Sequence, residues 1–302
     1  MRSNNHMEEI FSPYQNLSRE DSVDLLLYMG VITRNGYNNV TELLKDQRST
    51  KDHIYVFIAT HGGDPSAGYR IARALKHHYN KVTIVIPTFC KSAGTLMAIG
   101  CDELLIDDSG ELGPLDIQLK KTDELFGTSS GLDITQALNY LNRQTNEILD
   151  SNLVRLNGKY SISTKTSAEI ATRLAASVLE PIYAQIDPIR VGEINRALNI
   201  AFQYGKRLNE ASKILLNNEE TLMQLMMDYP DHGFVIDRKE AGTLFNNVGQ
   251  PSENMPHACE HTRKIYSYIS SSQEPLVELF KHSQAATQCG GDESTSNHRL
   301  DD

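Results

Sequence analysis

Two apolar runs, each followed by a turn and a helix, dominate the stretch from His53 to Asp116. Residues 54–59 form a continuous apolar, β-branched and aromatic run, and residues 82–86 form a second run that ends at Pro87. Runs of this length and composition are typical of strands that are buried on both faces. Two strand–turn–helix units in succession predict a parallel sheet, with its loops gathered at the carboxyl ends of the strands.

Both predicted strands lead into turns that carry unusual residues. His61-Gly62-Gly63 follows the first strand, and Asp64 and Pro65 then provide an N-cap and a first helical residue. The second strand leads to Ser92, which precedes a helix of small residues. Open α/β sheets bind their ligands at this edge, so both turns are candidates for a functional site.

The chemistry of the two turns suggests an enzyme that stabilises an oxyanion. A glycine pair lets backbone N–H groups face a cavity, because no side chain blocks the approach. The N–H groups beside Ser92 lie at the positive end of a helix dipole. We therefore predict that Gly62, Gly63 and Ala93 form an oxyanion hole and that Ser92 is the nucleophile. The structural alternative is a tight turn followed by a serine that caps a helix.

The motifs in this order resemble those of a known superfamily. The chain is similar to the Clp-peptidase/crotonase superfamily, more narrowly to the signal-peptide-peptidase-A-like serine peptidases, and most closely to the serine dehydrogenase proteinase group. The resemblance covers roughly residues 24–248. It is carried by Thr60–Asp64, Lys91–Thr95, Ala98–Glu103, Leu112–Asp116, Ile186–Glu193 and Tyr229–Asp237.

This resemblance implies an α/β fold of the Clp-peptidase/crotonase-like ββα-spiral type, with a parallel sheet and a helical C-terminal half. It also implies a serine-type peptidase that cleaves a peptide or protein substrate and forms a homo-oligomer. Two other functions share the fold. A crotonase-like acyl-CoA enzyme would use the oxyanion hole without a serine nucleophile, and a catalytically inactive oligomeric scaffold would use neither.

The identity of the general base remains open in the sequence. Clp peptidases place their catalytic histidine about where Gly113 and Pro114 stand here. Signal peptide peptidases use a lysine at the entrance of a helix, and Lys165 is the nearest match. His232 precedes a predicted strand and a Glu-Ala helix, and an imidazole with an ordinary pKa of about 6.5 suits the task. Both Lys165 and His232 are therefore candidates.

The composition limits the classes of partner that we expect for this protein. The net charge of −10 argues against nucleic acid or an anionic membrane as the main partner. No apolar run approaches the ~18 residues of a spanning helix, and the N-terminus lacks the apolar region of a signal peptide, so we expect a cytoplasmic protein. Nothing in the sequence identifies a membrane or ATPase partner, and either stays open. The four cysteines lack metal or disulfide spacing, and the glycine turn lacks the Lys-Ser/Thr of a phosphate loop, so we expect no metal and no cofactor.

Patterning divides the chain into four segments. We expect a flexible N-terminus over residues 1–20, a serine peptidase domain over 21–249, a peripheral helical extension over 250–282, and a disordered tail over 283–302. Within the domain, the spacing of apolar residues predicts a long amphipathic helix over 132–155. Asp237 and Glu240 form a capping box for the helix that follows.

Overall fold

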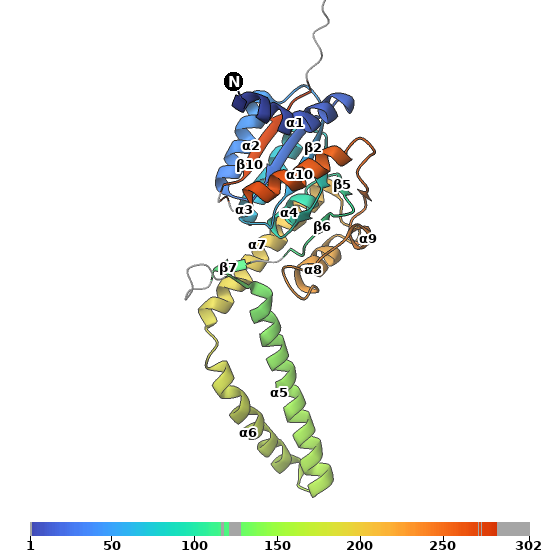
Figure 1. Cartoon of the computed structure of the whole chain (residues 1–302). Coiled ribbons are helices and arrows are strands. Elements are labelled where there is room, and N and C mark those ends of the chain that lie inside the picture. Colours follow the sequence, from blue (N-terminus) through green and yellow to red (C-terminus); the bar gives the residue numbers. More distant parts are fainter. Residues whose placement is uncertain (1, 116–117, 121–127, 271, 273, 283–302) are drawn as a thin grey trace, which may run out of the picture.

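A six-stranded sheet forms the centre of the molecule (Figure 1). The computed structural model describes residues 2–115, 118–120, 128–270, 272 and 274–282. The strands lie in the order β10-β1-β2-β3-β5-β9. Their bounds are β1 Asp24–Met29, β2 His53–Ala59, β3 Lys81–Ile86, β5 Glu103–Ile106, β9 Val248–Gly249 and β10 Leu276–Phe280.

Five of these strands run parallel, and β10 pairs with β1 in the antiparallel direction. The first connections are helices, as the alternating pattern predicts: α2 (Arg34–Gln47), α3 (Pro65–His78) and α4 (Ala93–Ile99). Asp64 caps α3 by accepting a hydrogen bond from Ser66 N–H at 2.8 Å. The predicted α/β class with a mostly parallel sheet is thus confirmed.

Helices cover both faces of the sheet, which explains why its strands are apolar throughout. One buried cluster joins the sheet to α2, α3, α4, α7 (Pro188–Ser212) and α8 (Glu219–Met227). A second cluster joins the other face to α1 (Arg2–Glu20) and α10 (Pro256–Ile269).

The two ends of the described chain belong to this second layer. We predicted a flexible segment before residue 21, but residues 2–20 form α1, with Tyr14 and Leu17 fully buried. The Tyr14 ring stacks on Phe280 at 5.5 Å, and its hydroxyl lies 3.0 Å from Thr262 Oγ1. Because β10 completes the sheet and α10 covers it, residues 250–282 are integral to the domain rather than peripheral. The predicted tail, 283–302, lies outside the described residues.

A second, small sheet crosses the carboxyl edge of the large one. Its strands β4 (Phe89–Cys90) and β6 (Glu111–Leu112) are parallel. Thr60 bridges to Cys90 on one side, and Ile236 bridges to Leu112 on the other. The glycine turn, the serine turn and the loop that carries His232 are therefore neighbours, although they are far apart in the sequence.

A helical hairpin projects from this body (Figure 1). Helix α5 (Gly131–Tyr160) contains the predicted helix over 132–155, and α6 (Thr164–Tyr183) runs back alongside it. The short strands β7 (Gln118–Lys120) and β8 (Thr128–Ser130) precede α5. Helix α9 (Arg238–Ala241) begins at the predicted cap, since Asp237 accepts from Glu240 N–H at 2.8 Å. None of the described helices combines the length and the apolar character needed to cross a bilayer.

Candidate active site

The glycine turn is fixed to the end of β1 by backbone hydrogen bonds. Gly62 and Gly63 have φ angles of 110° and 145°, which side chains rarely adopt. Ile32 N–H donates to Gly62 O, and Asp64 N–H donates to Ile32 O, both at 2.8 Å. A Cβ atom on Gly63 would collide with Ile32 O. The turn therefore requires glycine at both positions.

Ser92 lies in a strained turn between β4 and α4. Its φ of 53° and ψ of −113° are unusual for a residue with a side chain, and such geometry costs about 1–3 kcal/mol. Ser92 N–H donates to Pro114 O at 3.3 Å, and Ser92 O accepts the first helical bond from Leu96 N–H at 3.1 Å. The Ser92 side chain does not cap α4, which removes the interpretation of this serine as a capping residue.

The two turns are in close contact. A Cβ atom on Gly62 would lie 2.7 Å from Ser92 Cβ and 3.1 Å from Ser92 Oγ. Ser92 itself is 8% exposed. The structure thus brings together the predicted nucleophile and the glycine turn, in a place where the serine is largely buried.

Three backbone N–H groups, those of Gly62, Gly63 and Ala93, were predicted to form the oxyanion hole. Gly62 N–H donates to Thr60 Oγ1 at 3.0 Å, so it is engaged within the turn. The bonds to Ile32 use Gly62 O and Asp64 N–H, so Gly63 N–H takes no part in them. Ala93 opens α4, and an N–H in the first turn of a helix has no helical acceptor. Of the three predicted donors, the bonds described here engage Gly62 N–H and leave Gly63 and Ala93 as candidates.

The loop that carries His232 packs against the strand that leads to the serine turn. Leu112 and Ile236 exchange two backbone hydrogen bonds, each at 2.9 Å. Lys91 Nζ donates to Gly233 O at 2.8 Å. The Nδ1 atom of His232 is buried. These contacts place His232 at the same edge of the molecule as the serine turn.

His61 stands directly before the glycine pair, and its position in the sequence predicts no role for it. Its ring stacks on Phe89 at 4.0 Å, and Tyr266 of α10 meets Phe89 edge-on at 4.8 Å. Burial lowers the pKa of His61, and the positive charges of Lys91 and His232 lower it further. His61, His232 and Lys91 therefore share one electrostatic environment, in which a neutral His61 is favoured.

Lys165 lies elsewhere. It is the second residue of α6 and is exposed at the tip of the helical hairpin (Figure 1). The 30 residues of α5 span about 45 Å and separate that tip from the body. Within one chain, the structure does not bring Lys165 to Ser92. The hairpin length could not be read from Lys165 and its immediate neighbours in sequence.

Cys90 is close to Ser92 in the sequence but is a poor candidate nucleophile. Cys90 precedes Ser92 by two residues but is fully buried, and burial raises the pKa of its thiol far above the usual range.

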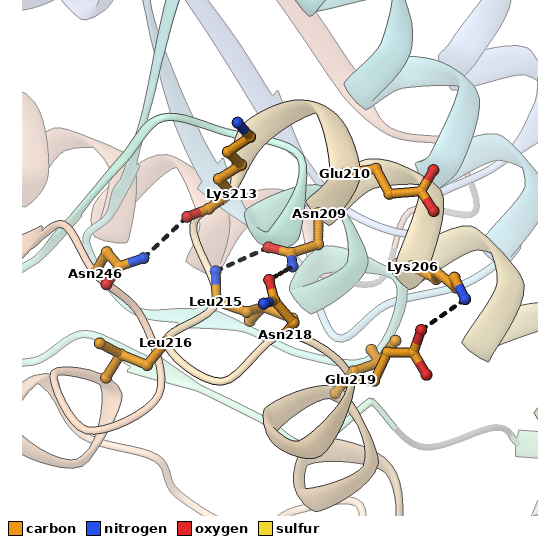
Figure 2. Close-up of a pocket in the computed structure, with 10 residues that line it drawn as sticks. Lys206, Asn209, Glu210, Lys213, Leu215, Leu216, Asn218, Glu219 and Asn246 are labelled. Atoms are coloured by element: carbon orange, nitrogen blue, oxygen red, sulfur yellow. Dashed lines mark hydrogen bonds and ion pairs between the residues drawn. The ribbon is translucent and has the colours of Figure 1, made fainter.

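A cavity of about 620 Å³ lies between α7 and α8 (Figure 2). Its polar groups pair with one another: Lys206 Nζ with Glu219 Oε1 at 2.6 Å, and Asn209 Nδ2 with Asn218 Oδ1 at 2.9 Å. Because these polar groups are paired with one another, we interpret the cavity as a structural feature rather than as the candidate active site.

The parallel sheet and the serine turn beside a glycine turn define an α/β fold of the Clp-peptidase type. Residues 18–152 match the model of the family described as ClpP-like SDH-type serine proteinase. Over those residues, the resemblance to the serine dehydrogenase proteinase group that the sequence motifs indicate is confirmed.

Two uncharacterized proteins of Methanocaldococcus jannaschii, MJ1495 and MJ0137, are each 39% identical, over 80 and 66 residues. These matches cover 26% and 22% of this chain, and 27% and 23% of the relatives, so the chain spans about a quarter of their length.

Among solved structures, a mutant of the 1510-N membrane-bound stomatin-specific protease has a TM-score of 0.31 and 16% identity. It matches over 49% of this chain and 68% of its own. ClpP1 from Listeria monocytogenes has a TM-score of 0.26 and 17% identity, and it matches over 49% and 78%.

Proposed function

We propose that this protein is a serine peptidase in which Ser92 is the nucleophile and His232 is the general base. The observation that supports this most strongly is the row Thr60–Cys90–Leu112–Ile236 in the small sheet. That row makes neighbours of the glycine turn, the serine turn and the His232 loop. The family match over residues 18–152 supports the same class of reaction.

The proposed reaction is acyl transfer from a peptide to the serine and then to water. His232 takes the proton from Ser92 Oγ as that oxygen attacks the peptide carbonyl carbon. Gly63 and Ala93 N–H groups stabilise the oxyanion, and each such donor contributes about 10²–10³ in rate. His232 then gives its proton to the leaving amine, the C–N bond breaks, and water hydrolyses the ester in the same way.

A fluorophosphonate probe tests the proposal, because it forms a covalent bond with an activated serine. We expect the purified protein to be labelled at Ser92, identified by peptide mass mapping, and Ser92→Ala to remain unlabelled. The variant Ser66→Ala is a matched control, since Ser66 lies at the start of α3 outside the proposed machinery.

Other results of this experiment would support the alternative functions. Binding of coenzyme A by a protein that resists the probe would favour a crotonase-like acyl-CoA enzyme. Resistance to the probe without such binding would favour an inactive scaffold. Either result would contradict the peptidase assignment.

We also propose that the chain assembles with further copies of itself through the helical hairpin. Helix α6 buries Ala171, Ala175 and Leu179 against α5. Next to that stripe, Leu174, Val178 and Ile182 are 43%, 53% and 40% exposed and follow one another at intervals of four residues. An apolar helix surface of this width is typical of a surface that packs against another protein.

A further inference from the structure

Lys91 is a buried cation beside the proposed nucleophile. It is 5% exposed, and a buried ammonium is stable only when its N–H groups are bonded. Its Nζ donates to Gly233 O at 2.8 Å and to Phe234 O at 3.3 Å, and it pairs with Glu111 Oε1 at 2.7 Å. These three acceptors match the three protons of the ammonium group.

The aliphatic part of the Lys91 side chain packs against Gly113. A Cβ atom on Gly113 would lie 2.8–3.0 Å from the Cγ, Cβ and Cδ atoms of Lys91. Gly113 N–H donates to Cys90 O at 3.1 Å, so this contact lies within the small sheet. The space beside Gly113 is therefore filled by the Lys91 stem.

The two carbonyl groups that Lys91 binds belong to the residues directly after His232. The same loop is held at Ile236 by its bridge to Leu112, and Asp231 Oδ1 accepts from Gly233 N–H at 2.6 Å. In the segment between Asp231 and Ile236, the Lys91 ammonium binds the loop and so connects it to the turn that contains Ser92. The position of the backbone at residues 233 and 234 therefore depends on its hydrogen bonds to that ammonium.

From this arrangement we infer that the Lys91–Glu111 pair is a clamp that positions His232 for its reaction with Ser92. Lys91 acts through the backbone of Gly233 and Phe234, so it is a positioning residue and does not touch the substrate. This inference rests on the proposed function for its catalytic consequence. The structural part, that the clamp fixes the His232 ring, stands independently of activity.

The catalytic part is tested with a double-mutant cycle on the rate of fluorophosphonate labelling. Lys91→Met keeps the length of the side chain but removes its donors. We expect a loss of about tenfold or more in the labelling rate, and a much smaller loss when the same change is made in His232→Ala. Losses that multiply in the double variant would show that Lys91 acts independently of His232, and they would overturn the inference.

Lys76→Met is the matched control. Its Nζ is also partly buried and binds Asp102 Oδ1 at 2.7 Å, but it lies on α3 outside the proposed machinery. We expect its labelling rate to equal that of the wild type. Lys91→Arg should recover part of the lost rate, because it restores the donors. Should Lys91→Met fail to fold, Glu111→Gln replaces it, with a smaller loss that again disappears in His232→Ala.

The structural part is tested without activity by NMR of protein with ¹³C-labelled histidine. The His232 signal is assigned by its absence in His232→Gln. The groups near it are His61 after β2, Glu111 on β6, Lys91, and Asp231 on its own loop. We expect Lys91→Met to shift the position of the His232 signal and Lys76→Met to leave it unchanged.

The two tests separate failure of the clamp from failure of the proposed function. A His232 signal that is identical in wild type and Lys91→Met would overturn the clamp, whatever the activity. If the wild type is not labelled by the probe but the signal shifts as expected, the peptidase proposal fails and the clamp remains.

Discussion

Gly62 and Ser92 approach so closely that one methyl group on Gly62 would lie 2.7 Å from Ser92 Cβ. The glycine turn and the serine turn are thus fitted to each other. Residues 62 and 92 come from different strand–helix units, so the contact depends on the register of the whole sheet. This relationship leads to predictions about both residues.

Gly62→Ala should reduce both stability and reactivity. The new methyl group would meet Ser92 Cβ and, at 3.0 Å, Lys91 O, and the φ of 110° is unfavourable for alanine. We expect the free energy of unfolding to fall by about 1–3 kcal/mol. The labelling rate of Ser92 should fall about 100-fold, because the methyl group displaces the nucleophile. Urea unfolding and fluorophosphonate labelling measure the two effects.

Gly192→Ala is the matched control for that change. Gly192 lies in α7, and a Cβ atom there would meet nothing within 4 Å. Alanine in a helix should stabilise the protein by about 0.5–1 kcal/mol and leave labelling unchanged. Equal behaviour of the two variants would contradict the packing of Gly62 against Ser92.

Ser92→Gly should stabilise the protein while it abolishes labelling. A φ of 53° with a ψ of −113° strains any residue that has a Cβ atom, and glycine relieves the strain. We expect Ser92→Gly to exceed Ser92→Ala in free energy of unfolding by about 1 kcal/mol. If Ser92→Gly is instead the less stable of the two, Ser92 is not strained in the folded protein.

Acidification should destabilise the fold through His53. Burial lowers the pKa of His53, with a further contribution from Lys81, and its Nε2 lies 2.9 Å from Thr83 Oγ1. As the pH falls below about 6.5, the unfolded chain takes up a proton before the folded chain does. The free energy of unfolding should therefore be highest above that pH and fall toward the lower pKa of the folded state.

His53→Gln should flatten this dependence, by at most about 1.4 kcal/mol per pH unit for one proton. Part of the slope should remain, because burial also lowers the pKa of His61 and His78. Urea unfolding at several pH values measures it, with His257→Gln on α10 as a control. An unchanged slope in His53→Gln would exclude this histidine as the source.

Val178→Glu should prevent assembly of further copies without unfolding the body. Val178 is 53% exposed and lies between Leu174 and Ile182 in the exposed apolar row on α6, so a charge there would be buried by any partner that packs on it. Light scattering should give a smaller mass for this variant than for the wild type. Arg173→Glu, on the other side of α6, should assemble normally, and an unchanged mass for Val178→Glu would exclude this surface.

The parts of the fold that the sequence predicts are those with local signals. The strand runs, the cap at Asp64, the capping box at Asp237 and the long helix α5 each depend on residues near one another in the chain. The parallel order of the sheet follows from the repeated strand–helix pattern and from the family resemblance. The closeness of the glycine turn and the serine turn was also predictable, because neighbouring parallel strands end at the same edge of a sheet.

Other parts depend on contacts between distant segments. Residues 2–20 have little strand or core signal of their own, and they form α1 because Tyr14 and Leu17 find a surface on β10 and α10. The Lys91 side chain could not be placed from sequence, since two of its three acceptors, Gly233 O and Phe234 O, lie 142 and 143 residues further on. Lys165 matched a family position in sequence, whereas the length of α5 decides where it lies.

The central claim is that the base acting on Ser92 comes from the His232 loop. The rate of fluorophosphonate labelling at pH 7.5 tests it most directly in three proteins: wild type, His232→Ala and Lys165→Ala. We predict that His232→Ala loses a factor of about 100 or more while Lys165→Ala keeps the wild-type rate. Undiminished labelling of His232→Ala, or a comparable loss in Lys165→Ala, would contradict the account.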